Sequence, residues 1–345
     1  MEKKHISFGK IPQFRDIIRN VNHQSQFEGF DQDGEPIYNT HARKPIIAFN
    51  GTVKLHGSNG AVCMSNEGEI WCQSRNRILS IEADNNGFWQ FCHDRETIFT
   101  ELFHKIADYI TVPMRVVSIF GEYCGQGINS GCAIHQLSKR FVVFAVKVVT
   151  EYDDSYYFDP SNLRDHVNQI YNIYDFKTFK VSVDFNYPEL AQNEFVKLVS
   201  EVESECPVGK AFDVSGVGEG IVWIGMYEGV RHVFKTKGEK HSTSKVKKVA
   251  SIDVDKINSI REFVDYAVTE NRMEQAVEEL FTSQNIEPAI QQMGDFLRWI
   301  MKDIAKEEAD TLGENNLTLK DVGRHVSNKA RVWFQDLLNS NAGLK

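Results

Sequence analysis

Short apolar runs that are typical of β-strands dominate the first two thirds of the chain. They are rich in Val, Ile and Phe, and turn-forming residues separate them. One such turn, Asn-Glu-Gly at residues 66–68, favours a hairpin between the two runs that flank it. The strands predicted in this way lie at residues 44–52, 61–64, 69–72, 115–120, 141–149, 221–224 and 232–234.

Apolar residues at helical spacing predict helices between these strands and after them. Within the strand-rich part, the helices are expected at 88–109, 163–173 and 190–203. Beyond residue 250 only helical patterns occur, at 257–268 and 290–304 and in a last helix that begins near Thr318. Asp321 follows Thr318 by three residues, which approximates a capping box.

The change of pattern near residue 250 predicts two domains. The first, residues 1–245, has the strand and helix content of a mixed α+β domain, and the second, residues 250–345, is all-helical. The boundary is expected in the basic stretch 237–250. From Arg231 to Lys248 there are seven Lys or Arg residues against one acid, Glu239.

Composition places the chain among ordinary soluble proteins. It is 41% hydrophobic and 25% charged, and no apolar run approaches the roughly 18 residues of a membrane helix. The N-terminus is charged and lacks the apolar core of a secretory signal, so we expect a cytoplasmic protein, including the cytoplasm of a host cell for a viral protein, with no membrane partner. The net charge of −9 disfavours a protein that coats nucleic acid, but it leaves nucleic acid open as a substrate.

The six cysteines are scattered, with no Cys-x-x-Cys pair and no spacing typical of zinc ligands. We therefore expect buried thiols rather than a disulfide framework or a structural metal.

Lys54 is the first candidate for chemistry. It stands at the end of an apolar strand and is followed by a turn that contains His56 and Gly57, which places it at the mouth of a pocket. A lysine amine attacks only when it is deprotonated, and its usual pKa of about 10.4 prevents that at neutral pH. Burial and nearby cations favour the neutral amine, and Lys235 and Lys237 could supply the cations.

Further polar and aromatic residues follow Lys54 at strand ends. Two acids, suited to ribose hydroxyls or a divalent cation, stand beside predicted strands. An aromatic residue could stack on a purine, and two lysines alternate onto one face of the last strand. Taken singly, each residue has an ordinary surface or core explanation, but their ordered combination does not. In chain order they are Arg75, Glu122, Phe144, Glu219, Lys235 and Lys237.

These stretches resemble a known family. Lys54-Leu-His56-Gly57 is similar to the KxHG adenylation motif of the RNA ligase 2 family, which includes phage and RNA-editing ligases. The stretches FGE at 120–122, VF at 143–144, EG at 219–220 and KTK at 235–237 resemble the later nucleotidyltransferase motifs in the same order. The resemblance implies an adenylyltransferase domain of antiparallel sheets with flanking helices, followed by an all-helical C-terminal domain.

The resemblance also implies the chemistry of an ATP-dependent RNA ligase. Lys54 would attack the α-phosphate of ATP to form a lysyl-AMP, which passes to a 5′-phosphate RNA end that a 3′-hydroxyl then attacks. The cofactors would be ATP and Mg²⁺, with Mn²⁺ as a substitute, and we expect a monomer. Val53, His56, Gly57, Asn59 and Arg75 would contact the nucleotide. Glu122 would hold the ribose, Phe144 would stack on adenine, Glu219 would serve the metal, and Lys235 and Lys237 would grip the α-phosphate.

Two positions depart from the family pattern. Ala145 stands where the family often has an acid, and Ile224 stands where it often has a lysine. Both are missing together, as if a pair had been lost. These departures bear on how substrate ends are handled more than on the first chemical step.

Three alternatives stay open. Another covalent nucleotidyltransferase, a DNA ligase or a capping enzyme, would share the lysine chemistry. Such enzymes mostly have an acid at the position of His56 and continue into a β-barrel, for which no strand pattern exists here. A non-catalytic RNA-binding relative would tolerate loss of Lys54. The glycines at 216–220 could form a dinucleotide loop, but a strand rather than a helix follows them.

Overall fold

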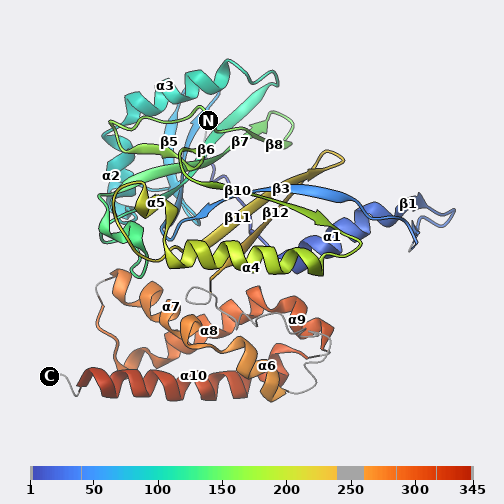
Figure 1. Ribbon diagram of the computed structural model, residues 1–345. Coiled ribbons are helices and arrows are strands. Elements are labelled where there is room, and N and C mark those ends of the chain that lie inside the picture. The colour runs from blue at the N-terminus through green and yellow to red at the C-terminus, as the bar shows by residue number, and fades with distance from the viewer. Residues whose placement is uncertain (1–2, 40, 239–259, 285, 316, 343–345) are drawn as a thin grey trace. The chain divides into compact units, whose positions relative to one another are not determined.

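A computed structural model describes residues 3–39, 41–238, 260–284, 286–315 and 317–342 (Figure 1). The chain divides into two compact units, Met1–Thr236 and Lys237–Lys345. Most of the basic stretch at 237–250, where the domain boundary is predicted, lies outside the described residues. Each unit has a hydrophobic core of its own.

The first sheet of the N-terminal unit has four strands in the order β10-β3-β11-β12. Both neighbours of β3 run antiparallel to it. Phe49, Trp223 and Phe234 point from one face of this sheet into a core that Phe14 and Phe195 complete. Those two residues belong to helices that cover this face (Figure 1). The elements are β3 (Ile46–Lys54), β10 (Thr178–Asp184), β11 (Gly220–Tyr227), β12 (Val230–Lys237), α1 (Phe14–Gln26) and α4 (Glu189–Ser204).

A two-residue turn fixes the register of β11 and β12. Glu228 and Gly229 both have positive φ, 46° and 77°, which is the geometry of the type I′ hairpin turn. Counting from this turn, the register places Lys235 beside Val222, and β11 in turn pairs Val222 with Thr52 of β3. Lys235 therefore lies two strands away from the end of β3.

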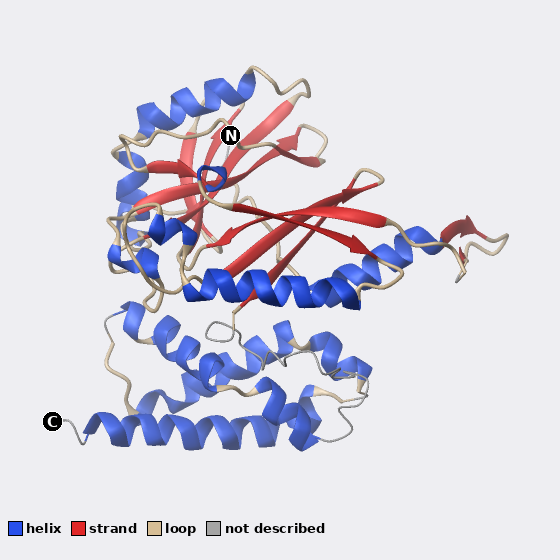
Figure 2. Cartoon of the chain, viewed as in Figure 1, coloured by secondary structure: helices blue, strands red, loops and turns tan. Residues whose placement is uncertain are grey.

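The second sheet has the order β5-β4-β6-β7-β8, and β9 pairs with β7 in parallel. Helices α2 and α3 cover one face, where Phe99, Leu102 and Phe103 are buried (Figure 2). Residues 3–12, which we call the strap, pack Ile6 and Phe8 onto the other face. The elements are β4 (Ser58–Ser65), β5 (Ile70–Ser74), β6 (Met114–Cys124), β7 (Arg140–Thr150), β8 (Ser155–Phe158), β9 (Ile170–Asn172), α2 (Phe88–His93) and α3 (Glu96–Ala107).

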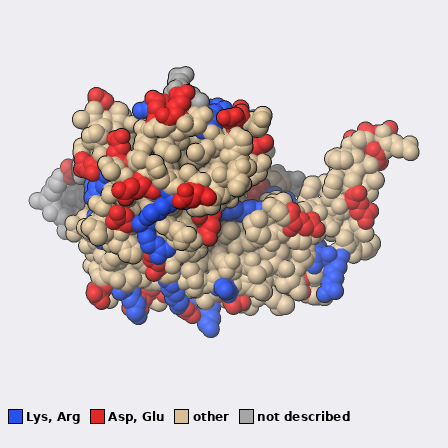
Figure 3. Space-filling view, turned by 90° about the horizontal axis from the view of Figure 1, so that it is seen from above, with Lys and Arg blue, Asp and Glu red and all other residues tan. Residues whose placement is uncertain are grey.

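A small hairpin of β1 (Phe27–Phe30) and β2 (Pro36–Tyr38) projects from the N-terminal unit. It has no third strand among the described residues. Phe30 is 67% exposed there, and acidic side chains accompany it on the arm seen at the right of Figure 3. A short helix, α5 (Pro207–Lys210), is the remaining α-helix of this unit.

The C-terminal unit is built from helices in its described parts. Phe263, Phe296, Ile300 and Phe334 are fully buried in its core. The last helix begins as the sequence predicts, because the Asp321 carboxylate accepts a hydrogen bond from the Thr318 backbone N–H at 2.7 Å. The helices are α6 (Ile260–Ala267), α7 (Glu270–Leu280), α8 (Met293–Glu307), α9 (Ala309–Glu314) and α10 (Leu319–Ala342). Within the described ranges, none of the helices is both long enough and apolar enough to span a bilayer.

The predicted mixed α+β fold with antiparallel sheets, flanking helices and C-terminal helices is confirmed. Several details are different. The helix predicted at 88–109 is two helices, α2 and α3, separated at Asp94 and Arg95. The helix predicted at 163–173 is wrong, since turns and the strand β9 occupy that segment. The elements that were not predicted are helices α1, α5, α7 and α9, strands β8 and β10, and the β1–β2 hairpin.

A buried arginine organises the helical unit. Arg272 of α7 is fully buried, and its guanidinium donates to Asp303 and to Glu308 at 2.9 Å each. It also donates to the backbone carbonyl of Ala267. Glu308 is itself fully buried, so each charge depends on the other for compensation.

Substitution Arg272→Ala is expected to destabilise the helical unit by about 3–5 kcal/mol, because it removes the buried guanidinium that compensates the charge of the buried Glu308 carboxylate. Chemical unfolding followed by far-ultraviolet circular dichroism measures the loss. Arg298→Ala is the matched control. Arg298 forms an ion pair with Asp295, and the two side chains are 76% and 57% exposed, so this pair should contribute about 1 kcal/mol or less. Equal losses in the two variants would contradict the structural role of Arg272.

Candidate active site

Strand register brings Lys54 and Glu219 together. Lys54 ends β3 and pairs with Gly220, the first residue of β11, so the residue before Gly220 lies next to the lysine. Lys54 Nζ donates to Glu219 Oε2 at 2.6 Å. Glu219 is 3% exposed and Lys54 is 21% exposed. The ammonium therefore faces a small opening while its carboxylate partner is enclosed.

The second sheet contributes Glu122 through the loop that joins β3 to β4. The backbone N–H of Gly57 in this loop donates to Glu122 Oε1 at 2.9 Å. Asn59 of β4 pairs with Glu122 of β6 in the sheet register. His56 also belongs to the loop, and its Nδ1 lies 3.7 Å from Glu219 Oε2. Five of the predicted site residues thus converge on Lys54 from both sheets: His56, Gly57, Asn59, Glu122 and Glu219. We call Lys54 and these five residues the Lys54 cluster.

Gly57 is required by close packing. A Cβ atom at this position would lie 2.5 Å from the carbonyl oxygen of Tyr123 and 2.9 Å from Cγ of Glu122. Both contacts are shorter than any normal van der Waals distance, and one of them is to backbone. The loop can approach β6 closely enough for its N–H to reach Glu122 only because this residue has no side chain.

The charges of the site perturb one another. Burial raises the pKa of Glu122 to about 7, and the neighbouring carboxylate of Glu219 adds to the rise, whereas Lys54 and the Gly57 N–H oppose it. Burial lowers the pKa of Lys54, but the carboxylates of Glu219 and Glu122 outweigh burial, and the net pKa is above its usual value. Two carboxylates therefore share one ammonium in a site shielded from water.

Burial favours the neutral amine of Lys54, as expected from the sequence, but the nearby acids Glu219 and Glu122 stabilise the ammonium and raise the net pKa above its usual value. Lys235 and Lys237 lie on β12 with half-buried side chains, directly after the buried core residue Phe234. Lys237 is also the first residue of the second compact unit.

The other predicted residues have separate surroundings. Val53 is 2% exposed and belongs to the core beneath β3. Phe144 of β7 is half-buried, and its ring centroid lies 5.1 Å from that of Phe8. Arg75 is exposed just after β5, whose last residue, Ser74, pairs with Gly60. Register therefore puts Arg75 near the start of β4, but its side chain makes no contact with the Lys54 cluster that the structure records.

Two residues beside the site were not predicted. Asn129 Nδ2 donates to the Gly57 carbonyl at 2.8 Å and so holds the other side of the loop. Its φ of 43° and the glycine-rich sequence around it were a usable clue to a structured turn. Phe8 gave no clue, because it lies 46 residues before Lys54 in a segment without a recognisable pattern.

A family model described as RNA ligase matches residues 48–237, which is more than half of the 345 residues. The chain belongs to the RNA ligase family. The match includes every residue of the Lys54 cluster, and the family predicted from the KxHG stretch is confirmed.

Among solved structures, this chain is similar in fold to the RNA ligase of Naegleria gruberi. The structure with PPi gives a TM-score of 0.42 at 16% identity, and a mutant with AMP and Mn gives 0.41 at 16% identity. Each match covers 68% of this chain and 56% of the Naegleria chain. Similarity at this level is too loose to place any residue. No curated protein sequence matches the chain.

Gly57→Ala is expected to destabilise the N-terminal unit by about 1–3 kcal/mol, because the added methyl group forces the loop away from β6. Urea unfolding followed by tryptophan fluorescence measures the change. The control is Gly313→Ala, in a helix where a Cβ atom meets nothing within 4 Å, so its effect should be below about 1 kcal/mol. A tolerated Gly57→Ala would show that the close approach to Tyr123 is not needed.

Glu122→Gln tests the raised pKa. In the folded protein the carboxyl holds its proton up to about pH 7, whereas its ordinary value is 4.5. Its contribution to stability is therefore full below pH 4.5 and is lost as the pH rises through 7. The stability of Glu122→Gln relative to the natural protein should increase from pH 5 to pH 8, by up to about 3 kcal/mol. An exposed control, Glu101→Gln, should show no such trend, and a flat difference for Glu122→Gln would refute the raised pKa.

Proposed function

We propose that this chain is an ATP-dependent RNA ligase that forms a covalent lysyl-AMP on Lys54. The observation that supports this most directly is the placement of Lys54 Nζ, 2.6 Å from Glu219 and enclosed with Glu122 at the junction of two sheets. Membership of the RNA ligase family gives the reaction class. A lysine held for structure alone would not need a second, destabilising carboxylate.

In the proposed first step, Nζ of Lys54 attacks the α-phosphorus of ATP. A nitrogen–phosphorus bond forms, the bond from the α-phosphorus to the bridging oxygen breaks, and diphosphate leaves with the electron pair. The amine must lose its protons, and Glu219 Oε2 is the base already in hydrogen-bond contact with it. Lys235, two strands away on β12, is proposed to neutralise phosphate charge together with Lys237.

A divalent cation fits the acids of the site. Mg²⁺ is usually held by one or two carboxylates together with phosphate oxygens of the substrate, and Glu219 is proposed to supply the carboxylate. Burial is the main cause of the raised pKa of Glu122, and the charge of Glu219 adds to the rise. When bound, Mg²⁺ or Mn²⁺ would neutralise phosphate charge.

The nucleotide is proposed to lie between the two sheets. Phe144 would stack on adenine, and His56, Gly57, Asn59 and Arg75 would contact the phosphates and ribose, with Glu122 on a ribose hydroxyl. Val53 would contribute through its backbone, since its side chain belongs to the core. The Naegleria RNA ligase is known with ATP and Mn, and the same pair is proposed here from the residues of this chain.

The later steps join RNA ends. AMP would pass from Lys54 to a 5′-phosphate, and a 3′-hydroxyl would then displace AMP to close a phosphodiester bond. We propose residues 1–245 as the adenylyltransferase domain, and residues 250–345 as a helical domain that helps a monomer engage RNA ends in repair or nick sealing. The described residues after 260 form helices without strands, which favours an RNA ligase over the DNA ligases and capping enzymes.

Transfer of label from α-labelled ATP to the purified protein tests the proposal. A labelled protein is expected with ATP and magnesium but not with GTP, and Lys54→Ala should abolish it, because the variant lacks the proposed nucleophilic amine. Intact mass should show AMP on unlabelled protein that was purified already adenylated. Absence of both label and bound AMP, or label that survives Lys54→Ala, would refute the covalent step.

A further inference from the structure

The strap ties the two sheets of the N-terminal unit together. At its start, Ile6 exchanges two hydrogen bonds with the Gln73 side chain of β5, at 3.0 and 2.6 Å. In its middle, Lys147 of β7 donates to the Ser7 carbonyl at 2.9 Å. At its end, the Lys235 backbone N–H of β12 donates to the Pro12 carbonyl at 3.1 Å. The strap thus contacts β5 and β7 of one sheet and β12 of the other.

Phe8 is the point where the strap meets the proposed adenine site. Its ring centroid lies 5.1 Å from that of Phe144, with the ring planes at 73°. On its other side the ring of Tyr157 lies 5.7 Å away at 83°. The Tyr157 hydroxyl donates to the Phe8 carbonyl at 2.9 Å, which fixes the backbone of the strap at this residue. Edge-to-face pairs of this kind stabilise a defined ring orientation.

Arg231 of the first sheet contacts the same aromatic group. Its guanidinium carbon lies 4.6 Å from the centroid of the Tyr157 ring, in cation–π contact. Arg231 and Lys235 are four positions apart on β12, so their side chains lie on the same face of the strand. The row from Arg231 through Tyr157 and Phe8 to Phe144 therefore spans from one sheet to the other.

One of the two departures from the family pattern, Ala145, lies in this region. Ala145 is 3% exposed and packs in the same cluster as Ile6, Phe8 and Phe144. An acid at this position would be buried against apolar side chains of the strap, at a large cost in solvation. Ile224 is the other position where a charge is missing. The family pair of acid and lysine is thus replaced here by apolar side chains and an aromatic row.

We propose that Phe8 and Tyr157, braced by Arg231, form the closed end of the nucleotide pocket and position the Phe144 ring for the purine. This inference rests on the proposed function, since it assumes that ATP binds beside Lys54. Phe8 and Tyr157 are positioning residues that set the affinity for the purine, and Lys54 carries the chemistry without them.

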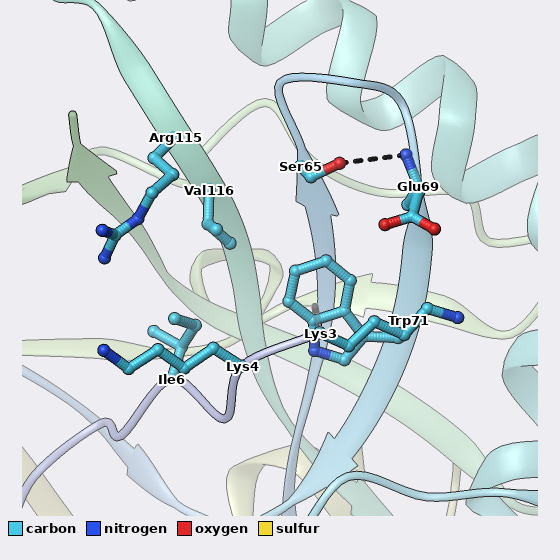
Figure 4. A pocket seen from close by; sticks show the side chains of 8 residues that line it. All are labelled: Lys3, Lys4, Ile6, Ser65, Glu69, Trp71, Arg115 and Val116. Carbon is cyan, nitrogen blue, oxygen red and sulfur yellow. Dashed lines mark hydrogen bonds between the residues drawn. The ribbon is translucent and has the colours of Figure 1, made fainter. Parts of the chain in front are cut away.

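The far end of the strap supplies a contrast. There Lys3, Lys4 and Ile6 line a pocket of about 200 Å³ together with residues of β4, β5 and β6 (Figure 4). Ser65 in this pocket lies six residues along β4 from Asn59, roughly 20 Å away at strand rise. The pocket is therefore separate from the Lys54 cluster, and a nucleotide beside Lys54 would lie away from this end of the strap.

The KM for ATP and the maximal rate, measured separately, distinguish a positioning role of Phe8 from a purely structural one. Phe8→Ala should raise the KM for ATP in lysyl-AMP formation by about tenfold with little change in maximal rate, because an aromatic wall is lost and the amine is not. Phe8→Leu should restore most of the affinity, and Tyr157→Phe should have a smaller effect. Phe103→Leu, in α3 on the opposite face of the second sheet, is the control for lost stability and should leave the KM unchanged.

Calorimetric titration of ATP with magnesium into Lys54→Ala protein, with and without Phe8→Ala, measures affinity where no reaction occurs. Weaker binding with Phe8→Ala is expected. Unchanged affinity, or tighter binding because the strap competes with the nucleotide, would overturn the inference. If ATP binds but the natural protein takes no label, the covalent reaction fails and the role of Phe8 is still decided by the titration. If ATP does not bind at all, both proposals fall.

Discussion

The enclosed ion pair between Lys54 and Glu219 is the constraint around which the N-terminal unit is arranged. An ammonium and two carboxyl groups share a largely buried site. Burying any one of these charges without the others would cost several kcal/mol of desolvation free energy. Meeting this requirement takes β3 and β11 in fixed register, a loop that can touch β6, and a glycine at its tightest point. The two sheets therefore meet at Lys54, Glu122 and Glu219.

This arrangement places two carboxyl groups beside one ammonium. Burial, with the added charge of Glu219, raises the pKa of Glu122 to about 7, so this carboxyl accepts a proton near neutral pH. Such a site is more complementary to a cation and a polyphosphate together than to either partner alone. The same acids that hold the lysine protonated are the groups that a nucleotide and its metal would engage, so binding and activation of the lysine are linked through one pair of side chains.

Sequence reasoning found the parts of the site that follow strands and missed those that depend on distant packing. The ends of β3, β6 and β11 carry Lys54, Glu122 and Glu219, and each stands beside an apolar run, so alternation located them. The sign of the lysine's electrostatic environment could not be predicted, because it depends on which of several nearby charges is closest in space. The helix expected at 163–173 failed because an apolar spacing of this length also suits a strand between turns. Phe8 and the strap lacked any local pattern, since tertiary contacts alone hold them.

The strap also affects how the chain can fold during synthesis. Residues 6–12 are made well before the last of their partners, because the Pro12 carbonyl accepts a hydrogen bond from Lys235, more than two hundred residues further on. At about 5–20 residues per second, a ribosome takes roughly 10–45 s to cover this interval. Ile6 and Phe8 can pack once the second sheet has been made as far as Tyr157, whereas the end of the strap has to wait for β12. The strap therefore joins the two sheets only after β12 has been made.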